Sequence, residues 1–510
     1  MTDALTIEPA HRARPGSESD SGSGEVDRAV RAADLAFRTS VRSPATDRTR
    51  WLRTVADRLD DAADELIAIA TAETGLATPR LVGEVARTTG QLRMFAAVIE
   101  EGSYVEAIID HAATSATPPR PDLRRTLRPI GPVAVFAASN FPFAFSVAGG
   151  DTASALAIGA PVIVKAHSGH PLLSLRTAEI VSAALAEAGA PDGLFGLVGA
   201  AADGSSRAIG IELVEHPLVA AASFTGSVAG GRALADRAAA RPEPIPFFGE
   251  LGSLNPVVVT AEADAARGEA LAAGLAGSFQ GSAGQLCTKP GIVFVPRGSV
   301  LEAALPPHVG AAPHRLLTEA IDGGFRNGVE HLAAVPGVEL VAGGIGSENG
   351  PAPVVYAVGL DAFADDRHRD VLTREVFGPT TLLVRYDAQD ALLPVLTELE
   401  GSLTATIHAA PEGELVLDGL VEVLAARAGR LLFDGWPTGV AVTWSQHHGG
   451  PWPATTSQHT SVGGTAVRRF QRPIVYQDAP AAVLPPELQE DNPLRIPRRV
   501  DGALRLPSRP

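Results

Sequence analysis

The chain has 510 residues, 45% of them hydrophobic, with a formal net charge of -16 and a single cysteine. This length indicates two or three domains, and the acidity argues against a surface for nucleic acids or anionic membranes, since both favour clustered Lys and Arg. One cysteine cannot form an internal disulfide, and no stretch approaches the roughly 20 apolar residues of a membrane span. With no apolar signal-peptide pattern at its start, the composition predicts a soluble cytoplasmic protein.

The first 24 residues predict a disordered lead, because Pro15 to Gly24 consists of Pro, Gly, Ser and acidic residues. Apolar residues at three- and four-residue steps then predict helices over 25–70 and a further helix over Pro79–Ile99. Between 113 and 128, three prolines are mixed with four arginines. We expect this part to be an extended, basic, protruding segment.

From residue 132 onward the pattern alternates between strands and helices. Apolar runs predict strands at 133–138, 161–165, 194–198 and 219–224, and helices are predicted at 146–158 and 171–188. Such alternation is typical of an α/β protein with a parallel, doubly wound sheet. A second α/β segment follows from about 255 to 443, and 465–510 predicts a strand and a tail rich in Pro and Arg.

Cys287 stands in Gly-Gln-Leu-Cys-Thr (284–288), with glycines at 281, 284 and 291. A lone cysteine is more often a small buried hydrophobic residue. The glycines favour another interpretation, because they allow a flexible backbone that approaches other groups closely. A thiol on such a turn can face a ligand, so Cys287 is a candidate nucleophile.

Two segments that follow predicted strands are candidates for a nucleotide site. Residues 224–231 (Phe-Thr-Gly-Ser-Val-Ala-Gly-Gly) open a helix, where backbone amides can hold a pyrophosphate, although a simple helix cap is the alternative. Lys165 ends a strand and can donate to ribose hydroxyls, or it is merely solvated. At Ser168 a carboxylate would repel a ribose phosphate, whereas serine does not, so NADP should be tolerated.

Three further polar residues suggest chemistry. Glu250 lies between glycines in an apolar run, and burial would raise its pKa towards that of a general base, unless it forms a structural ion pair. Asn140 follows a strand, and its amide can donate to an oxyanion or simply form a turn. Glu375 begins Glu-Val-Phe-Gly-Pro (375–379), which can clamp a ribose beside an aromatic ring, or form an ordinary turn.

Six motifs occur in a fixed order: 139–142 (Ser-Asn-Phe-Pro), 164–165 (Val-Lys), 224–227 (Phe-Thr-Gly-Ser), 250–252 (Glu-Leu-Gly), 284–287 (Gly-Gln-Leu-Cys) and 375–379 (Glu-Val-Phe-Gly-Pro). In this order they resemble the aldehyde dehydrogenase superfamily, over roughly residues 25–505. Finer features resemble its α-ketoglutaric semialdehyde (2,5-dioxovalerate) and NADP-dependent fatty aldehyde dehydrogenase branch. These features are 145–152, 165–167, Ser253 in place of a second glycine, 287–291, 449–455, 491–494 and 500–502.

The resemblance implies an aldehyde dehydrogenase-like fold. A Rossmann-type NAD(P)-binding domain would span 25–105 and 129–251, and an α/β catalytic domain would span 252–464. A small β oligomerisation element and tail would use 106–128 and 465–510. The resemblance also implies a homodimer or homotetramer.

Roles for individual residues follow from the same resemblance. Cys287 is the implied nucleophile, Glu250 the general base, and Asn140 with the Cys287 backbone amide the oxyanion site. The cofactor is NAD or NADP, with NADP tolerated or preferred. Its implied contacts are Lys165 and Glu375 at the riboses, Phe377 at the nicotinamide, Gly226 and Ser227 at the pyrophosphate, and Ser168 and Arg207 near a ribose phosphate.

On the substrate side, Phe141, Phe145 and Leu286 are expected at the tunnel. Leu286 stands where this branch often has Phe, so the tunnel is expected to be wider. A dicarboxylic semialdehyde needs a cation at the far end of the tunnel, and Arg93 and Lys289 are the candidates.

The implied reaction is NAD(P)-dependent oxidation of an aldehyde through a cysteine thiohemiacetal and thioester, with α-ketoglutaric semialdehyde giving 2-oxoglutarate. A medium- or long-chain or aromatic aldehyde is the alternative substrate. A CoA-acylating enzyme would not need Glu250, a thiol hydrolase would need a Cys–His pair that no motif suggests, and a non-catalytic scaffold would lack these groups. No metal is expected, because the spacing of three histidines fits no common zinc site and the cysteine is distant in sequence: His447, His448 and His459.

Overall fold

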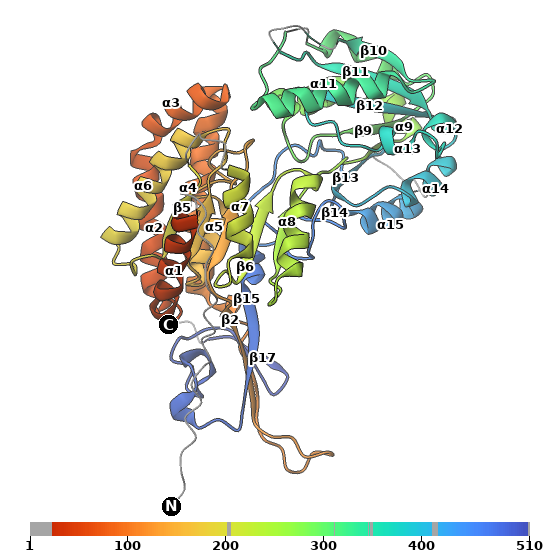
Figure 1. Ribbon diagram of the computed structural model, residues 1–510. Coiled ribbons are helices and arrows are strands. Elements are labelled where there is room, and N and C mark those ends of the chain that lie inside the picture. Colours follow the sequence, from red (N-terminus) through yellow and green to blue (C-terminus); the bar gives the residue numbers. More distant parts are fainter. Residues whose placement is uncertain are drawn as a thin grey trace, which may run out of the picture.

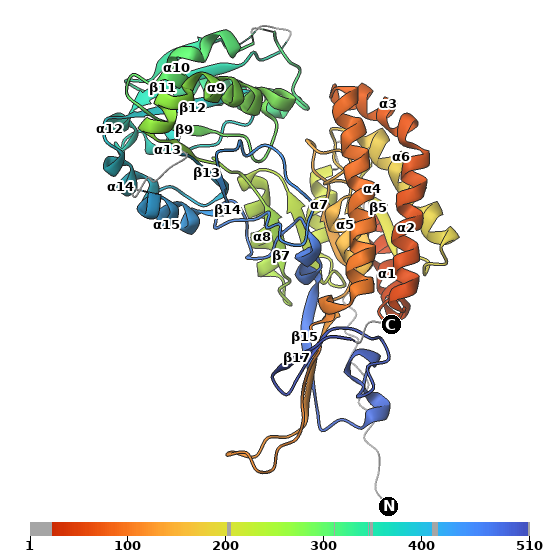
Figure 2. The same ribbon diagram turned by 180° about the vertical axis from the view of Figure 1, so that it is seen from behind.

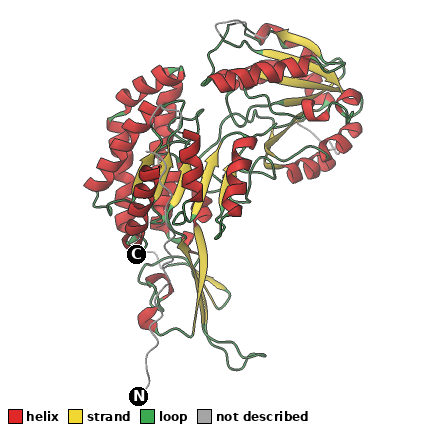
Figure 3. Ribbon diagram, viewed as in Figure 1, coloured by secondary structure: helices red, strands yellow, loops and turns green. Residues whose placement is uncertain are grey.

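The computed structural model describes residues 23–200, 206–310, 312–344, 346, 350–410 and 417–507. Residues 1–22, most of the expected disordered lead, lie outside these ranges. Two large lobes are each built on a sheet, and a third, smaller sheet projects below the first lobe (Figures 1 and 3). Within the described ranges, no helix is long and apolar enough to cross a membrane.

The first lobe contains the expected parallel, doubly wound sheet, with strand order β5-β4-β3-β6-β7. The chain moves outward from β3 to β5 and then returns to β6 on the other side of β3. Ligands of such sheets bind beyond the carboxyl ends of the strands where the order reverses, which is here between β3 and β6. The elements are β3 (Val133–Phe136), α5 (Gly150–Ala157), β4 (Val162–Lys165), α6 (Pro171–Glu187), β5 (Phe195–Val198), α7 (Ser206–Glu215), β6 (Ala221–Thr225), α8 (Val228–Ala240) and β7 (Phe247–Glu250).

Helices precede this sheet, as the apolar spacing predicted, and α2 packs against both α4 and α6. Trp51 and Leu52 of α2 and Phe95 of α4 lie fully buried in one core with strands β3 and β4. The helix α4 ends at Gly102, whose φ of 86° is the left-handed conformation that glycine adopts readily. The bounds are α1 (Ser23–Ser40), α2 (Ala45–Asp61), α3 (Ala63–Thr74) and α4 (Thr78–Glu101).

The second lobe has a seven-stranded sheet in the order β10-β11-β12-β9-β8-β13-β14, parallel except for the edge strand β10. Its central strands β8, β9 and β13 are buried, as expected for strands covered on both faces, and β8 and β9 are also apolar. The strands are β8 (Val257–Val259), β9 (Ile292–Pro296), β10 (Glu339–Gly343), β11 (Val354–Gly359), β12 (Thr380–Tyr386), β13 (Ser402–His408) and β14 (Ala428–Phe433). The helices are α9 (Ala261–Gln280), α10 (Val300–Ala304), α11 (Glu319–Ala333), α12 (Leu360–Phe363), α13 (Arg369–Leu372), α14 (Leu392–Thr397) and α15 (Leu417–Arg427).

After β14 the chain runs back between the lobes and joins the small sheet, which has the order β15-β2-β1-β16-β17 (Figures 1 and 2). This sheet pairs the basic segment with the C-terminal part of the chain. Its strands are β1 (Ile108–Asp110), β2 (Leu123–Pro129), β15 (Gln471–Gln477), β16 (Arg498–Val500) and β17 (Ala503–Arg505). Short 3-10 helices are η1 (Ser103–Val105), η2 (Gly281–Gly284), η3 (Pro306–His308), η4 (Gln389–Ala391), η5 (Gly464–Phe470), η6 (Ala481–Val483) and η7 (Pro486–Leu488).

One helix begins later than expected. We expected a helix from residue 146, but α5 starts at Gly150, and the preceding residues form tight turns. The backbone N–H of Gly150 donates to the carbonyl oxygen of Ala144 at 3.0 Å. A Cβ on Gly149 would lie 2.5 Å from the same oxygen. Close approach of the backbone to itself therefore delays the start of the helix to Gly150, which residue spacing alone does not reveal.

Candidate active site

Cys287 lies in the loop between η2 and β9, where its side chain is partly exposed. Gly284 has a φ of 68°, and a Cβ at this position would lie 2.2 Å from the carbonyl group of Gly378. From another side, Asn255 Nδ2 donates to the carbonyl oxygen of Cys287 at 2.8 Å. The backbone that carries the thiol is therefore fixed by close packing and by a hydrogen bond.

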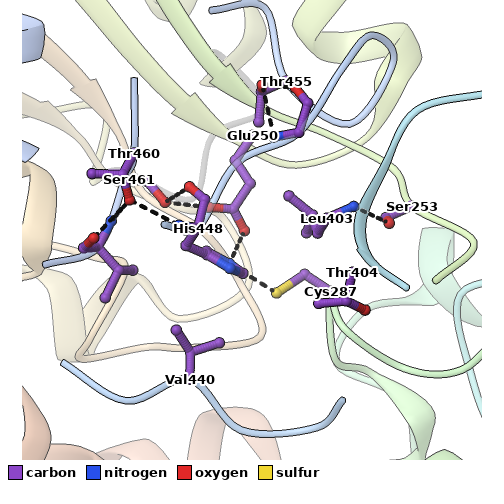
Figure 4. A network of polar contacts seen from close by, with 12 residues as sticks. Glu250, Ser253, Cys287, Leu403, Thr404, Val440, His448, Thr455, Thr460 and Ser461 are labelled. Carbon is purple, nitrogen blue, oxygen red and sulfur yellow. Dashed lines mark hydrogen bonds and ion pairs between the residues drawn. The ribbon is translucent and has the colours of Figure 1, made fainter. Parts of the chain in front are cut away.

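Glu250 and His448 converge on this thiol (Figure 4). Cys287 Sγ lies 3.6 Å from His448 Nε2, and the same nitrogen lies 2.9 Å from Glu250 Oε1. The other oxygen of Glu250 accepts a hydrogen bond from Ser461 Oγ at 2.7 Å, and the backbone N–H of His448 donates to Thr460 Oγ1 at 2.8 Å. Because one ring nitrogen faces both groups, it either accepts from the thiol or donates to the carboxylate, depending on the tautomer.

The environment sets the charges of this group. Burial opposes ionisation of Glu250, but His448 and the Ser461 hydroxyl outweigh it and hold the pKa of Glu250 below the usual glutamate value. The expected increase in the pKa of Glu250 is therefore wrong: burial does raise this pKa, but partners that the sequence did not reveal lower it by more. Burial and the Glu250 carboxylate raise the pKa of the Cys287 thiol well above its usual value. The resting thiol therefore keeps its proton and needs a neighbouring base.

Asn140 follows β3 and is buried beside the cysteine loop. Its Nδ2 donates to the carbonyl oxygen of Gln285 at 3.1 Å, and Arg80 Nη2 donates to the carbonyl oxygen of Asn140 at 2.5 Å. Glu84 accepts hydrogen bonds from the backbone N–H groups of residues 143 and 144, at 2.8 and 3.0 Å. Two side chains of α4 thus hold the segment that presents the Asn140 amide.

The expected cofactor residues lie at the carboxyl ends of the first sheet's strands. Lys165 ends β4, where burial lowers its pKa, and its Nζ donates to Ser206 Oγ at the start of α7. Gly226 and Ser227 are exposed between β6 and α8, and Ser227 Oγ caps the helix by accepting from Gly230 N–H at 3.2 Å. An open helix N-terminus at the reversal of strand order fits a dinucleotide. Other expected contacts are exposed or partly exposed: Ser168, Arg207 and Phe377.

Glu375 approaches the first sheet from the second lobe. A Cβ on Gly252 would lie 2.6 Å from Glu375 Oε2, and the backbone N–H of Ser253 donates to this carboxylate. Burial raises the pKa of Glu375, although the nearby Lys289 ammonium partly offsets this effect. The absence of a side chain at residue 252 therefore leaves room for a carboxylate at the edge of the cofactor crevice.

Lys289 and Arg93, the two expected substrate cations, lie in different environments. Lys289 is buried, and its Nζ donates to the carbonyl oxygen of Thr380 at 2.7 Å. Arg93 lies on the solvent side of α4, where its Nη2 pairs with Asp57 at 2.6 Å and with Asp60 at 2.8 Å. The surface position of Arg93 contradicts its assignment to the tunnel, whereas the assignment of Lys289 stays a prediction.

Two other arginines, which the sequence analysis missed, flank the site. Arg87 Nη1 donates to the carbonyl oxygen of Val440 at 3.0 Å, and Arg430 donates to the carbonyl oxygens of residues 437 and 439 at 2.8 and 3.0 Å. Among the described residues, the buried Nε atoms of both arginines and Nη2 of Arg87 have no hydrogen-bond partner. Both positive charges act on Cys287. Their free N–H groups are available to a bound anion.

Aromatic side chains lie beside these charges. The Phe145 ring centre lies 5.6 Å from the Arg87 guanidinium, 6.2 Å from the His448 ring and 5.4 Å from the Phe141 ring. Leu286, directly before the cysteine, is partly exposed. Apolar residues that pack with Phe145 are Ala138, Phe141, Ala144, Val440, Val442 and Val462.

The position of His448 overturns two arguments made from sequence. A thiol hydrolase was excluded for want of a Cys–His pair, and a metal site was excluded because the cysteine lies far from the histidines. The fold brings Cys287 and His448 together across 161 residues. One signal was available, since His448 directly precedes 449–455, one of the motifs that carried the family resemblance.

Known proteins share both the sequence and the fold. A model of the aldehyde dehydrogenase family matches residues 2–310. Alpha-ketoglutaric semialdehyde dehydrogenase 2 of Azospirillum brasilense is 45% identical over 486 residues, which cover 94% of this chain and 91% of the relative. The alpha-ketoglutaric semialdehyde dehydrogenase of Acinetobacter baylyi is 40% identical over 488 residues, with the same coverage. This chain belongs to the aldehyde dehydrogenase family.

Solved structures of the family have the same fold. Aldehyde dehydrogenase 21 of Physcomitrella patens, in complex with the reaction product succinate, superposes with a TM-score of 0.74 at 22% identity, covering 91% of this chain and 92% of that chain. A 1-pyrroline-5-carboxylate dehydrogenase from Thermus with bound NAD gives 0.73 at 22% identity, covering 90% and 86%. The protein is an oxidoreductase that oxidises an aldehyde with NAD or NADP.

Proposed function

We propose that this enzyme oxidises α-ketoglutaric semialdehyde to 2-oxoglutarate, with Cys287 as nucleophile, Glu250 as general base and Asn140 as a donor to the oxyanion. The observation that carries the proposal is the convergence of the partly exposed Cys287 with the buried His448 and Glu250. Both curated relatives are named for this semialdehyde and align over almost the whole chain.

The first step is attack of the thiolate on the aldehyde carbon. We assign His448 as the base that accepts the thiol proton at Nε2, because this nitrogen lies 3.6 Å from Sγ and the thiol pKa is raised. This transfer requires the tautomer with a proton on Nδ1, so the hydrogen bond from Nε2 to Glu250 must open. The resulting alkoxide of the thiohemiacetal receives hydrogen bonds from Asn140 and a backbone amide.

NAD or NADP supplies the hydride acceptor in the crevice beside Glu375. Loss of hydride from the thiohemiacetal leaves a thioester on Cys287. Glu250 then takes a proton from water, which attacks the thioester carbonyl and releases the acid and the thiolate. Ser461 keeps one oxygen of Glu250 in place through this step.

The catalytic assignment is tested by the formation of reduced cofactor. Cys287→Ser and His448→Gln should each lower kcat by at least about 100-fold, as expected for loss of a nucleophile or of its base. His459→Gln is the matched control, because His459 is exposed on the same return segment. Activity of His448→Gln close to that of the control would refute the role of His448.

Arg87 and Arg430 support a substrate with a distal carboxylate. Their unpartnered N–H groups lie on the substrate side, near the Phe145 ring and the 437–440 loop. A buried guanidinium binds a carboxylate strongly, and removing it typically costs 2–5 kcal/mol, roughly 30- to 5,000-fold in affinity.

The test compares two aldehydes. Arg87→Met should reduce kcat/KM for α-ketoglutaric semialdehyde at least about 30-fold while leaving hexanal within about threefold. Arg93→Met is the matched control, since this arginine lies on the outer surface of the same helix. Equal losses for both aldehydes would favour a medium- or long-chain or aromatic substrate, which the apolar residues around Phe145 also fit.

We further propose that NADP is accepted, that the enzyme forms a homodimer or homotetramer through its small sheet, and that it acts in the cytoplasm. Ser168 beyond β4 and Arg207 in the first turn of α7 support NADP, since neither would repel a ribose phosphate. Ser168→Asp should lower kcat/KM for NADP at least about tenfold more than for NAD, because a carboxylate repels the phosphate. Equal effects on both cofactors would contradict this placement.

A further inference from the structure

Three metal-ligating atoms lie close together at the site. The ligand atoms of Glu250, Cys287 and His448 are within 4.8 Å of one another, with 3.6 Å between Sγ and Nε2 and 2.9 Å between Nε2 and Oε1. Ligands around a tetrahedral Zn²⁺ ion, at bond lengths of roughly 2.0–2.3 Å, stand roughly 3–4 Å apart. The observed spacing accommodates such an ion after the contact between His448 and Glu250 opens by roughly half an ångström.

We propose that Glu250, Cys287 and His448 form a binding site for one Zn²⁺ ion, and that the bound ion reversibly inhibits the enzyme. The ion holds the thiol and the carboxylate at the same time, so neither can react. Binding rests on the geometry alone. Inhibition rests in addition on the proposed catalytic roles of Cys287 and Glu250.

The donor set selects the metal. A thiolate, an imidazole and a carboxylate suit Zn²⁺, whereas Mg²⁺ and Ca²⁺ require six or more oxygen ligands. On binding, the ion displaces the proton of the thiol, which leaves to solvent, and Nε2 donates its lone pair while the ring proton resides on Nδ1. The thiolate and the carboxylate then balance the charge of the ion, so the occupied group is neutral, which suits a site with two buried ligands, Glu250 and His448.

Each ligand is already held by a contact that the ion does not displace. Ser461 Oγ donates to the outer oxygen of Glu250, Thr460 Oγ1 accepts from the backbone of His448, and Asn255 donates to the carbonyl oxygen of Cys287. Figure 4 shows the three ligand side chains pointing toward one another. Such outer contacts orient metal ligands and raise affinity 10- to 100-fold, which makes this group pre-organised for the ion.

Binding is measured on the reduced, metal-free full chain, without aldehyde or cofactor, by competition with a colorimetric zinc chelator. We expect one tight Zn²⁺ ion per chain and none for Mg²⁺. Addition of Co²⁺ should produce thiolate-to-cobalt charge-transfer absorption. Cys287→Ser and His448→Gln should each lower zinc affinity by more than about 100-fold, since loss of a ligand exceeds loss of an outer contact.

His111→Gln is the matched control for a histidine beside carboxylates. His111 lies 2.7 Å from Asp501 and 3.0 Å from Glu490 on the surface, and its replacement should leave tight zinc binding unchanged. Wild-type protein alkylated at Cys287 with iodoacetamide tests the same ligand without a substitution that could impair folding. This alkylated protein should not bind zinc tightly. Tight binding that survives alkylation, or that is lost in His111→Gln, overturns the proposal.

Inhibition is measured in the same samples. One equivalent of Zn²⁺ should abolish formation of reduced cofactor, and a chelator should restore it. Zinc that binds with the expected ligand dependence but leaves turnover intact would sustain the site and overturn both the inhibition and the catalytic role of Cys287. A failure of the proposed zinc site can therefore be distinguished from a failure of the proposed catalytic role of Cys287.

Discussion

Substitution of Gly284 should disable the enzyme without touching a reacting group. In Gly284→Ala the new Cβ would lie 2.2 Å from the carbonyl group of Gly378, whereas ordinary contacts begin near 3.4 Å, so the loop must move by about 1 Å. The φ of 68° adds about 1–2 kcal/mol of left-handed strain, and overpacking adds about 1–3 kcal/mol, giving about 2–5 kcal/mol in the free energy of unfolding. A displacement of this size in a loop that carries a nucleophile costs about 100-fold in kcat.

The same loop offers a matched control. At Gly281 a Cβ would meet only a Leu286 methyl group at 3.8 Å, and φ is negative, so Gly281→Ala should retain nearly full activity. The assay combines kcat for reduced cofactor, urea unfolding and the rate at which Cys287 reacts with a thiol reagent. If Gly284→Ala keeps kcat within about threefold of wild type, or if Gly281→Ala loses as much, the argument from close packing is wrong.

Three further predictions follow from contacts around the site and in the small sheet. Glu84→Ala leaves two buried backbone N–H groups without an acceptor and should cost about 2–5 kcal/mol in urea unfolding, whereas Glu84→Gln, which keeps an acceptor, should stay within about 1 kcal/mol. Gly252→Ala places a Cβ 2.6 Å from Glu375 Oε2 and should raise KM for the cofactor about tenfold, while the rate of labelling of the Cys287 thiol stays unchanged. If the KM for the cofactor and the labelling rate change equally, the assignment of Glu375 to the cofactor is wrong. Asp501 raises the pKa of His111, so the pairing of these two residues stabilises the fold below the unfolded pKa of about 6.5. This stabilisation is lost as the pH rises through the folded pKa. His111→Gln should therefore lower the free energy of unfolding in urea by about 0.5 kcal/mol at pH 5.5 and leave it unchanged at pH 9.

Periodicity predicted the elements well where burial repeats along the chain. The helices α4 and α6 and the strands β3 to β6 were predicted within a few residues, because each buries a continuous apolar face. The prediction of a helix from residue 146 failed at residues 146–149, where the backbone N–H of Gly150 turns back to the carbonyl oxygen of Ala144. Contacts of this kind depend on glycine and on the direction that the backbone takes after each turn, and a pattern of apolar residues does not encode that direction.

In the candidate site too, residues within local motifs could be predicted and residues joined only by the fold could not. Cys287, Glu250 and Asn140 could be predicted because each sits in a local motif, and the structure brings them to one place. His448 could not, since its partner lies 161 residues away and only the return of the chain between the lobes joins them.

The proposed substrate cation illustrates the same limit of sequence analysis. Arg87 and Arg93 stand on one helix, six residues and therefore about 120° apart around its axis. Either arginine fits the sequence pattern of a cation on α4. Only the packing of that helix against its neighbours decides which of the two faces the thiol and which faces solvent.

The return of the chain between the lobes also means that the proposed site is completed late in synthesis. During synthesis Cys287 emerges long before His448 and Ser461, which are 161 residues from Cys287 and 211 residues from Glu250, respectively. Until that last part of the chain packs, the thiol has no base beside it and Glu250 has no hydroxyl to hold it. The contacts of His448 with Cys287 and of Ser461 with Glu250 therefore form only after residues 448 and 461 have been made.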